Sequence, residues 1–297
     1  MQPSSLEEAA TLVGDACTTG RTIRIGRDLS TERLDRVLEH EAGDLTCTVE
    51  AGIRLGALRS ALAPAGQRLS LDPPGDPTIG ACIASRLSGP LSHRFGAPRD
   101  LVLGVTLVLG DGTVASSGGK VVKNVAGYDL GKLVCGSEGR LALVVRASLR
   151  LHPLPVARET LVVETGEAAA VVRELRRSRL EPSAVDVLHP GRVALLFEGG
   201  ERGVETQLET AQALLGGRVG DDSIWDESRT RQGDASGRMR FVPRDLENLL
   251  STLGEAIVRP SAGIAYVPHR VGGVPTAAAR RLHRALKERL DPAGVLA

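Results

Sequence analysis

Hydrophobic and polar residues in the first half of the chain switch repeatedly between a helical period and a strand period. Ser5 and Glu8 form a capping-box pattern, which predicts a short helix at the start of the chain. Helical spacing marks residues 30–40 and 55–62, whereas strand-like patterns mark residues 21–26, 45–52, 101–109 and 113–115. Asp111-Gly112 between the last two segments predicts a tight hairpin turn. The pattern therefore predicts a mixed α and β domain.

Residues 117–155 have an unusual density of glycine, with a polar Lys-Asn-Tyr-Asp loop between glycine turns. Asp129 is a suitable N-cap and Gly136 a suitable C-terminal stop for a short helix between them. Alternating apolar residues then predict a strand over residues 141–151. Because glycine permits a positive φ and a close backbone approach, we expect a ligand against this segment.

Residues 71–100 form a second unusual stretch. Prolines 73, 74 and 77 surround Gly75 and favour an extended or turning backbone. Thr78-Ile79-Gly80 then opens a run of small residues that predicts a short helix. The free N–H groups of that helix are expected to meet an anion or a carbonyl group.

Residues 152–155, with the sequence HPLP, mark a change of composition and are the predicted domain boundary. Beyond them the pattern predicts strand, helix, strand, strand and helix at residues 160–164, 167–180, 184–188, 193–198 and 203–215. This order is typical of a ferredoxin-like lobe. A polar loop is expected at residues 221–240. Helices are predicted at 244–253 and 276–290, with a strand at 263–267.

Composition narrows the possible partners and compartment. The chain has 297 residues and a net charge of +1, so no nucleic acid partner is expected. No apolar run approaches the roughly 20 residues of a membrane-spanning helix, and no signal-peptide pattern precedes the first helix. The four cysteines are far apart, and the six histidines lack metal-ligand spacing. We therefore expect a reduced, cytoplasmic protein without a transmembrane segment or a metal.

Taken together, the two glycine-rich stretches resemble the vanillyl-alcohol-oxidase/p-cresol-methylhydroxylase family of FAD enzymes. Within it, they are most similar to the FAD-binding E subunits of bacterial glycolate oxidase. The main matching motif is GKVVKNVAGYDL at residues 119–130, far longer than a lone GxGxxG. The other matching motifs are DPPG at 72–75, TIG at 78–80, SGP at 88–90, FG at 95–96, GSEG at 136–139, LHPLP at 151–155 and DPAG at 291–294.

The resemblance implies an α+β protein: a two-lobed FAD-binding domain of the p-cresol-methylhydroxylase type, residues 1–155, followed by a ferredoxin-like α/β cap domain, residues 156–297. It implies FAD as the cofactor, held along the backbone of the matching motifs. The implied FAD-binding residues are Pro74, Gly75, Thr78, Ile79, Gly80, Ser85, Ser88, Gly89, Phe95, Gly96, Glu138, Gly139, Leu141, Val144 and Val145. No catalytic residue is assigned.

The chain departs from the family pattern on the side that holds the pyrophosphate. Gly26-Arg27-Asp28 stands where relatives carry a glycine-rich loop, so the first lobe is expected to be shortened. Ala81 and Arg140 also replace residues that are usual in the family. Arg86 is either a compensating phosphate contact or an incidental change. Lys120, Lys123 and Asn124 belong to a flavin-side or subunit-contact loop, or to an ordinary solvated one.

Three functional hypotheses follow from the resemblance. The first is an FAD subunit of a glycolate-oxidase-type complex that oxidises a 2-hydroxy acid to a 2-oxo acid and passes electrons to a partner. Its implied partners are a homologous flavoprotein subunit and an iron–sulfur subunit. The second is a degenerate scaffold subunit without flavin, and the third an independent FAD oxidoreductase acting on another alcohol. Tyr266, His269 and Arg270 fall where the cap is expected to return over the flavin, either as a carboxylate clamp or as a plain loop.

Overall fold

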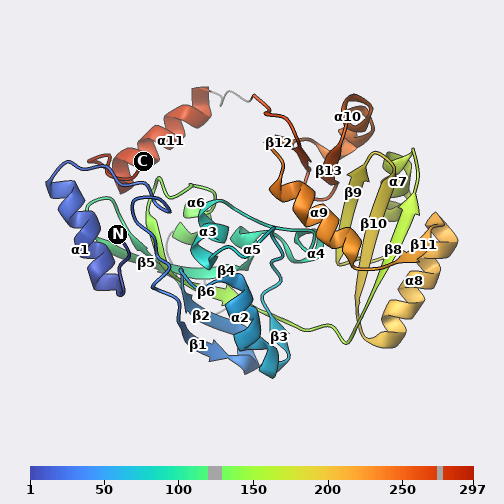
Figure 1. Cartoon of the computed structure of the whole chain (residues 1–297), viewed down its shortest axis with the longest axis horizontal. Helices are drawn as coiled ribbons and strands as arrows, with labels where there is room; N and C mark the ends of the chain where they lie inside the picture. The colour runs from blue at the N-terminus through green and yellow to red at the C-terminus, as the bar shows by residue number, and fades with distance from the viewer. Residues whose placement is uncertain (120–128, 273–276) are drawn as a thin grey trace.

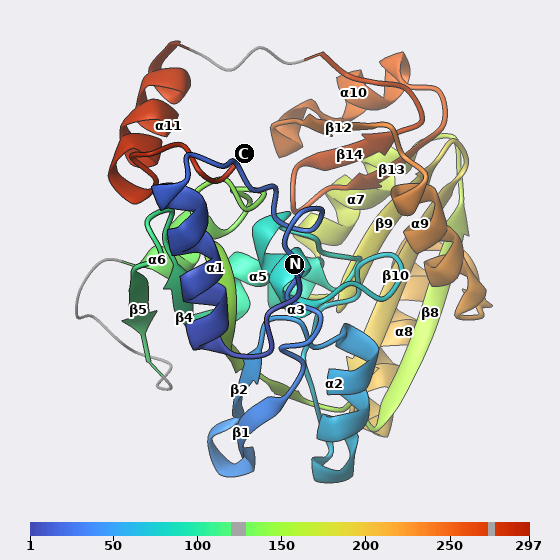
Figure 2. The ribbon, with the colours of Figure 1, turned by 60° about the vertical axis from the view of Figure 1, so that its left-hand side comes forward.

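The computed structural model describes residues 1–119, 129–272 and 277–297. Two antiparallel sheets form the centres of two domains, which stand side by side (Figure 1). Both chain ends lie in the first domain. Helix α11 (Ala277–Leu290) also lies against this domain, as both views show (Figures 1 and 2). None of the helices in the described part of the chain is long and apolar enough to cross a membrane.

The first domain is built around strand β6 (Leu143–Arg150) at the centre of a five-stranded sheet. The order across this sheet is β1 (Val37–Glu41), β2 (Thr46–Glu50), β6, β4 (Val102–Val108) and β5 (Val114–Gly118). Helix α1 (Leu6–Thr18) covers one face with a small apolar cluster. The opposite face carries α2 (Leu55–Leu62), α3 (Ile79–Ala84), α5 (Pro98–Leu101) and α6 (Leu130–Val134) over the main core.

Three short elements connect this domain to the second one. Strands β3 (Gln67–Arg68) and β7 (His152–Pro153) pair with each other, so the predicted boundary segment is tied to the first domain. Helix α4 (Ser92–Phe95) follows a loop that packs against the second domain through Leu91. The two domains therefore meet along residues 68–95 of the first.

The second domain contains a seven-stranded sheet with the order β11, β8, β10, β9, β13, β14, β12. Its outer face carries helices α7 (Ala168–Arg177), α8 (Glu201–Leu215) and α10 (Leu246–Thr252) over one apolar cluster. Helix α9 (Ser223–Gly233) lies on the inner face, toward the first domain (Figure 2). The strands are β8 (Ala157–Glu164), β9 (Ala184–His189), β10 (Arg192–Gly199), β11 (Arg218–Gly220), β12 (Gly237–Arg240), β13 (Ala256–Arg259) and β14 (Ile264–Val267).

Three of the expected elements are wrong. Residues 21–26 form no strand but only isolated bridges, of Ile23 with Leu296 and of Ile25 with Leu29. Residues 30–40 form no helix: Leu34 is buried in an irregular segment, and strand β1 begins at Val37. Residues 221–240 are not a loop but contain α9 and β12. Helix α9 buries Ser228 and Gln232 as well as Ile224 and Trp225. Because those polar side chains are hydrogen-bonded in the interior, the helix shows no apolar stripe in its sequence.

The end of the chain closes the core of the first domain. Val295 and Leu296 pack in the cluster under α1, and Leu296 forms a parallel bridge with Ile23. The buried Asp291 carboxylate accepts hydrogen bonds from the amides of Val295 and Leu296, each at 2.8 Å, and from Lys287 Nζ at 2.5 Å. One carboxylate thus fixes the geometry of the last turn.

Replacing Asp291 by alanine is expected to loosen this end of the chain. The two amides would lose their acceptor inside the protein, at a cost of about 1–3 kcal/mol for each group left unpaired. Hydrogen exchange of the amides of Ile23, Val295 and Leu296 measures the effect, because local opening exposes them first. The exposed Asp15 provides the control, and Asp15→Ala is expected to leave the exchange of these amides unchanged. Equal protection in the Asp291 variant would contradict the anchor.

Candidate functional site

A cavity of about 530 Å³, called here the first cavity, opens between the first lobe and strand β6. Three segments surround it: residues 25–32, the start of α3, and the turn that leads into β6. Apolar atoms of Ile25, Ala84 and Val144 form part of its wall. Its charged lining residues are Arg27, Arg54, Glu32 and Glu138, and Arg54 pairs with Glu32 at 2.8 Å, so Arg27 is the arginine of the lining without a carboxylate partner among the described residues. A pocket of this size is typical of a bound cofactor or small molecule.

The turn before β6 has a backbone that only glycine adopts freely. Glu138 has φ +55° and Gly139 has φ +75°, both in the left-handed region. A Cβ on Gly139 would stand 2.7 Å from Ile25 Cβ, which is too close for two non-bonded carbon atoms. The absence of that atom lets the two walls approach each other at the first cavity.

The N–H groups at the start of α3 meet carbonyl groups rather than the cavity. The amide of Ile79 donates to Ile53 O at 2.9 Å, and the amide of Gly80 donates to Ala51 O at 2.6 Å. Of the two alternatives for these groups, the structure therefore supports the carbonyl. Thr78 Oγ1 caps the helix by accepting from Ala81 N at 3.2 Å.

At the turn where the sequence predicts a shortened loop, two backbone amides likewise form hydrogen bonds within the turn. Arg27 N and Asp28 N both donate to Arg24 O, at 3.2 and 2.8 Å. The Asp28 carboxylate pairs with the Arg24 guanidinium at 2.8 Å. Charge for a phosphate group must then come from side chains, and Arg27, in the lining of the first cavity, is placed to supply it.

A second hollow of about 270 Å³ lies between the domains and is called the interdomain hollow. Consecutive residues line the two spaces: Ala84 and Ser85 line the first cavity, and Arg86 and Leu87, which follow them in the sequence, line the hollow. Arg86 has φ +51°, a strained backbone for a residue with a side chain. From the second domain, Gln232, Gly233, Arg238 and Tyr266 complete the wall. The two spaces together suit a cofactor in the first cavity whose far end faces the interdomain hollow.

A buried polar network joins the domains beside this hollow. Arg259 Nε donates to Asp186 Oδ1 at 3.2 Å, and both side chains are almost fully buried. Arg259 also donates to Gln232 Oε1 at 2.6 Å and to the main-chain oxygen of Ser88 at 3.2 Å. Gln232 Nε2 donates to that same oxygen at 2.8 Å. Two side chains of the second domain therefore fix the loop of the first domain that follows Arg86.

Asp72 is a buried carboxyl next to this network. Its oxygens accept from Leu91 N at 3.0 and 3.3 Å, and Arg229 stands 3.8 Å away. Burial raises the pKa of Asp72 to about 7. Arg259, the Leu91 amide and Arg229 act in the opposite direction but do not outweigh burial. Asp72 is therefore largely protonated in mildly acidic solution.

The raised pKa predicts a loss of stability with rising pH. Between the unfolded value of about 4 and the folded value near 7, the unfolded chain binds fewer protons, so the free energy of unfolding falls as pH rises. Relative to an Asp72→Asn variant, the decline is expected to approach about 1.4 kcal/mol per pH unit in that window and to cease above it. Urea titrations from pH 5 to 8 measure it. Parallel curves for the two proteins would be inconsistent with the assigned pKa.

The predicted FAD-binding residues fall into three groups. Those that line the first cavity are Thr78, Gly80, Ser85, Glu138, Gly139 and Val144. Pro74 lines the interdomain hollow, whereas Gly75 faces another cavity across the same loop. Those without a place in either lining are Ile79, Leu141 and Val145 in the core, Ser88 and Gly89 beside the second domain, and Phe95 and Gly96 around α4.

Some positions that the sequence suggested lie elsewhere. Lys120, Lys123, Asn124 and Tyr128 are outside the described residues. His269 and Arg270 are exposed and absent from the lining of the hollow, which Tyr266 does reach. No group of three or more potential metal ligands occurs within residues 1–119, 129–272 and 277–297.

The second domain's contribution to the hollow was not predicted from the sequence. Arg238 and Gln232 lay in a predicted loop, and Arg259 lay outside every predicted element. A useful indication was available in the chain: Arg259 is a charged residue inside the apolar run AIVRP. A charge in such a run is buried only when it is paired, so it marks a polar network.

Comparison with known proteins identifies the cofactor of the chain. A family model described as an FAD binding domain matches residues 9–118, which include the Thr78–Gly80 wall of the first cavity. The chain is therefore similar to FAD-dependent oxidoreductases with an FAD-binding domain of the p-cresol-methylhydroxylase type. FAD is accordingly its cofactor, and the glycine cradle, the apolar wall and Arg27 of the first cavity fit a nucleotide.

Individual relatives show this similarity in more detail. The chain is 29% identical to glycolate oxidase subunit GlcE of Escherichia coli (strain K12), over 91% of its own length and 87% of the relative's. It is 33% identical to mitochondrial D-lactate dehydrogenase [cytochrome] 1 of Saccharomyces cerevisiae, over 60% of its length but only 30% of that protein. A solved alkyldihydroxyacetonephosphate synthase shares the fold, with a TM-score of 0.77 and 18% identity, over 99% of this chain and 76% of that one.

Proposed function

We propose that this chain is the FAD-binding subunit of a complex that oxidises a 2-hydroxy acid to a 2-oxo acid and passes the electrons to a partner. The similarity to GlcE over most of both chains supports a role as a subunit. The similarity to a D-lactate dehydrogenase supports the substrate class, because glycolate and lactate are both 2-hydroxy acids. A homologous flavoprotein subunit and an iron–sulfur subunit are the proposed partners.

The charge of the interdomain hollow is the observation that carries the proposed substrate class. Its described lining contains two arginines, Arg86 and Arg238, and no carboxylate. Arg238 is exposed by its solvent accessibility, but partial desolvation lowers its pKa; Tyr266 acts in the opposite direction, and the neighbouring charges of Arg240 and Arg86 lower the pKa further. Two like charges facing one space favour an anionic occupant, and the planar guanidinium group matches a carboxylate.

Bound FAD would supply the chemistry by accepting a hydride from the carbon that bears the hydroxyl group. The protein residues hold the reactants in place. The side chains of the first cavity hold the nucleotide end, and Arg86 and Arg238 orient the substrate carboxylate in the interdomain hollow. The polar network around Arg259 keeps the second domain closed on the loop that carries Arg86.

The second domain is proposed to act as a cap, with the domain boundary near residue 155. The strand order β11, β8, β10, β9 with helices α7 and α8 on one face supports a ferredoxin-like core, extended by β13, β14 and β12. The pairing of β3 with β7 ends the first domain at the proposed boundary. A reducing, cytoplasmic location is consistent with four cysteines that form no disulfide.

Flavin reduction by candidate substrates tests the proposal. The chain, purified with added FAD, is expected to show flavin absorbance that bleaches without oxygen when glycolate or D-lactate is added, alone or with its partner subunits. Protein without flavin would instead support the scaffold hypothesis. Steady turnover by the isolated chain on a simple alcohol, with no response to 2-hydroxy acids, would support an independent oxidoreductase.

Arg238→Met is expected to raise the KM for the 2-hydroxy acid about tenfold or more, since a charge-assisted hydrogen bond to the carboxylate is lost. FAD content should stay the same, because Arg238 does not line the first cavity. The matched control is Arg240→Met, an exposed arginine of the same strand that is absent from the lining of the hollow. An unchanged KM in the Arg238 variant would count against a carboxylate in the hollow.

A further inference from the structure

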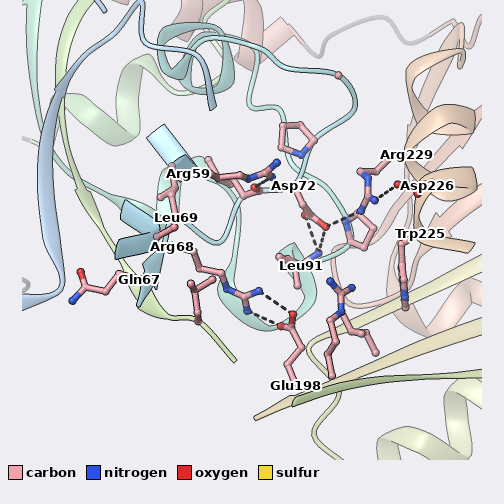
Figure 3. Close-up of a pocket in the computed structure, with 18 residues that line it drawn as sticks. Arg59, Gln67, Arg68, Leu69, Asp72, Leu91, Glu198, Trp225, Asp226 and Arg229 are labelled. Carbon is pink, nitrogen blue, oxygen red and sulfur yellow. Dashed lines mark hydrogen bonds and ion pairs between the residues drawn. The ribbon is translucent and has the colours of Figure 1, made fainter. Parts of the chain in front are cut away.

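A separate cavity of about 540 Å³, called the arginine-lined cavity, lies between the domains on the other side of the loop 72–75 (Figure 3). Pro73 and Gly75 face this cavity, whereas Pro74 of the same loop faces the interdomain hollow. It shares no lining residue with the first cavity. It is therefore a space distinct from the proposed FAD and substrate positions.

The carboxylates that line this cavity already have cationic or amide partners. The Glu198 carboxylate accepts hydrogen bonds from both terminal nitrogens of Arg68, at 2.9 and 2.6 Å. Asp226 accepts from Arg229 at 2.5 Å, and Asp72 accepts from the Leu91 amide. Figure 3 shows these contacts as dashed lines between the lining side chains. Little acidic capacity remains for a cationic ligand.

Arg59 on helix α2 differs from Arg68 and Arg229 in the kind of group to which it donates a hydrogen bond. Its Nη2 donates to the main-chain oxygen of Leu71 at 2.7 Å, and no carboxylate pairs with its guanidinium among the described residues. Nη1 and Nε of Arg59 therefore retain donor capacity at the cavity. Arg158 adds a second cation to the lining, and its ion-pair partner, Asp222, lies outside the lining. The lining thus has a surplus of positive donors.

The rest of the wall is apolar. Leu69, Leu71, Leu196 and Trp225 are all at least 97% buried and line the cavity. The indole N–H of Trp225 already donates to Thr160 Oγ1 at 2.9 Å, so the ring offers only carbon surface. A ligand for this space needs an apolar body as well as a negative charge.

We propose that the arginine-lined cavity binds a small organic carboxylate, with its carboxylate on Arg59 and its hydrocarbon body against the leucines and Trp225. Guanidinium and carboxylate groups match in shape and charge, which favours a carboxylate over a spherical anion. The site spans both domains, so occupancy also holds the cap against the first domain. This site is independent of the proposed oxidation of a 2-hydroxy acid.

The cavity contains its own reporter, because Trp225 is the only tryptophan of the chain. Titration of the FAD-loaded protein with acetate, 3-methylbutanoate and phenylacetate is expected to give a saturable change in tryptophan emission with the two larger acids. The uncharged 3-methylbutanamide and inorganic phosphate should give none. The absence of a saturable change with all three acids, or the same change with the amide, would overturn the proposal.

Arg59→Gln is expected to weaken the binding of 3-methylbutanoate about tenfold or more through loss of the charge-assisted contact. Arg59→Lys, which keeps the charge but not the fork, should weaken it less. Arg176→Gln on α7, an exposed arginine far from the cavity lining, is the matched control. Unaltered tryptophan emission without ligand verifies folding of each variant. Wild-type affinity in Arg59→Gln would refute the site.

Discussion

Replacement of Arg259 by methionine is expected to lower the free energy of unfolding by about 3–5 kcal/mol, as removal of one partner from a buried ion pair does elsewhere. Asp186 is fully buried, and its remaining hydrogen bond in the network would come from Ser228 Oγ. Gln232 Oε1 and Ser88 O would each lose a donor as well. Urea unfolding at neutral pH measures the difference.

The matched control for this variant is Arg173→Met. Arg173 pairs with Glu247 at 3.4 Å, and both side chains are more than half exposed. Exposed pairs of this kind contribute about 0–1 kcal/mol, so the control should unfold almost like the wild type. The double variant Asp186→Asn/Arg259→Met removes both buried charges and should recover part of the loss. Equal stability of the Arg259 and Arg173 variants would contradict the interdomain network.

Replacement of Gly139 by alanine is expected to weaken FAD binding by about tenfold or more. A residue with a Cβ in the left-handed region costs about 1–2 kcal/mol. If the backbone relieves this strain by moving the turn at Gly139 away from Ile25, the same energy corresponds to a roughly tenfold loss of FAD affinity. The added Cβ would also press on Ile25, 2.7 Å away, at the wall of the first cavity. The ratio of flavin to protein absorbance after dialysis measures the retained cofactor.

Gly43→Ala serves as the control for Gly139→Ala. A Cβ added at Gly43 would have no atom within 4 Å, and the residue has no positive φ. The control should retain FAD and stability like the wild type. A Gly139 variant that keeps its flavin through dialysis would show that the approach of Ile25 and Gly139 is unimportant for the cofactor.

The first domain could be predicted well from its motifs. Asp129 caps α6 through Lys132 N at 2.9 Å, and the alternating apolar residues after Gly139 form β6. These features depend on neighbouring residues, so a local pattern contains them. The segment of residues 30–40 shows the limit, because the spacing of its apolar residues imitates a helix while tertiary packing of Leu34 determines the backbone.

The second domain's part in the site could not be predicted in the same way. Helix α9 buries Gln232 and Ser228, whose partners Ser88 and Asp186 lie 144 and 42 residues away. A polar side chain that is buried only because of a distant partner looks like a surface residue in the sequence. Arg238 likewise becomes part of the interdomain hollow only once β12 has paired with β14.

The anchoring of the chain end in the first domain has a consequence for the order of folding. Leu296 completes the cluster that Ile23 and α1 begin, so contacts of very high sequence separation close this core. During synthesis the first domain emerges early but lacks part of its interior until Val295 and Leu296 have been added. The second domain, whose sheet is formed by residues 157–267 alone, can complete its core first.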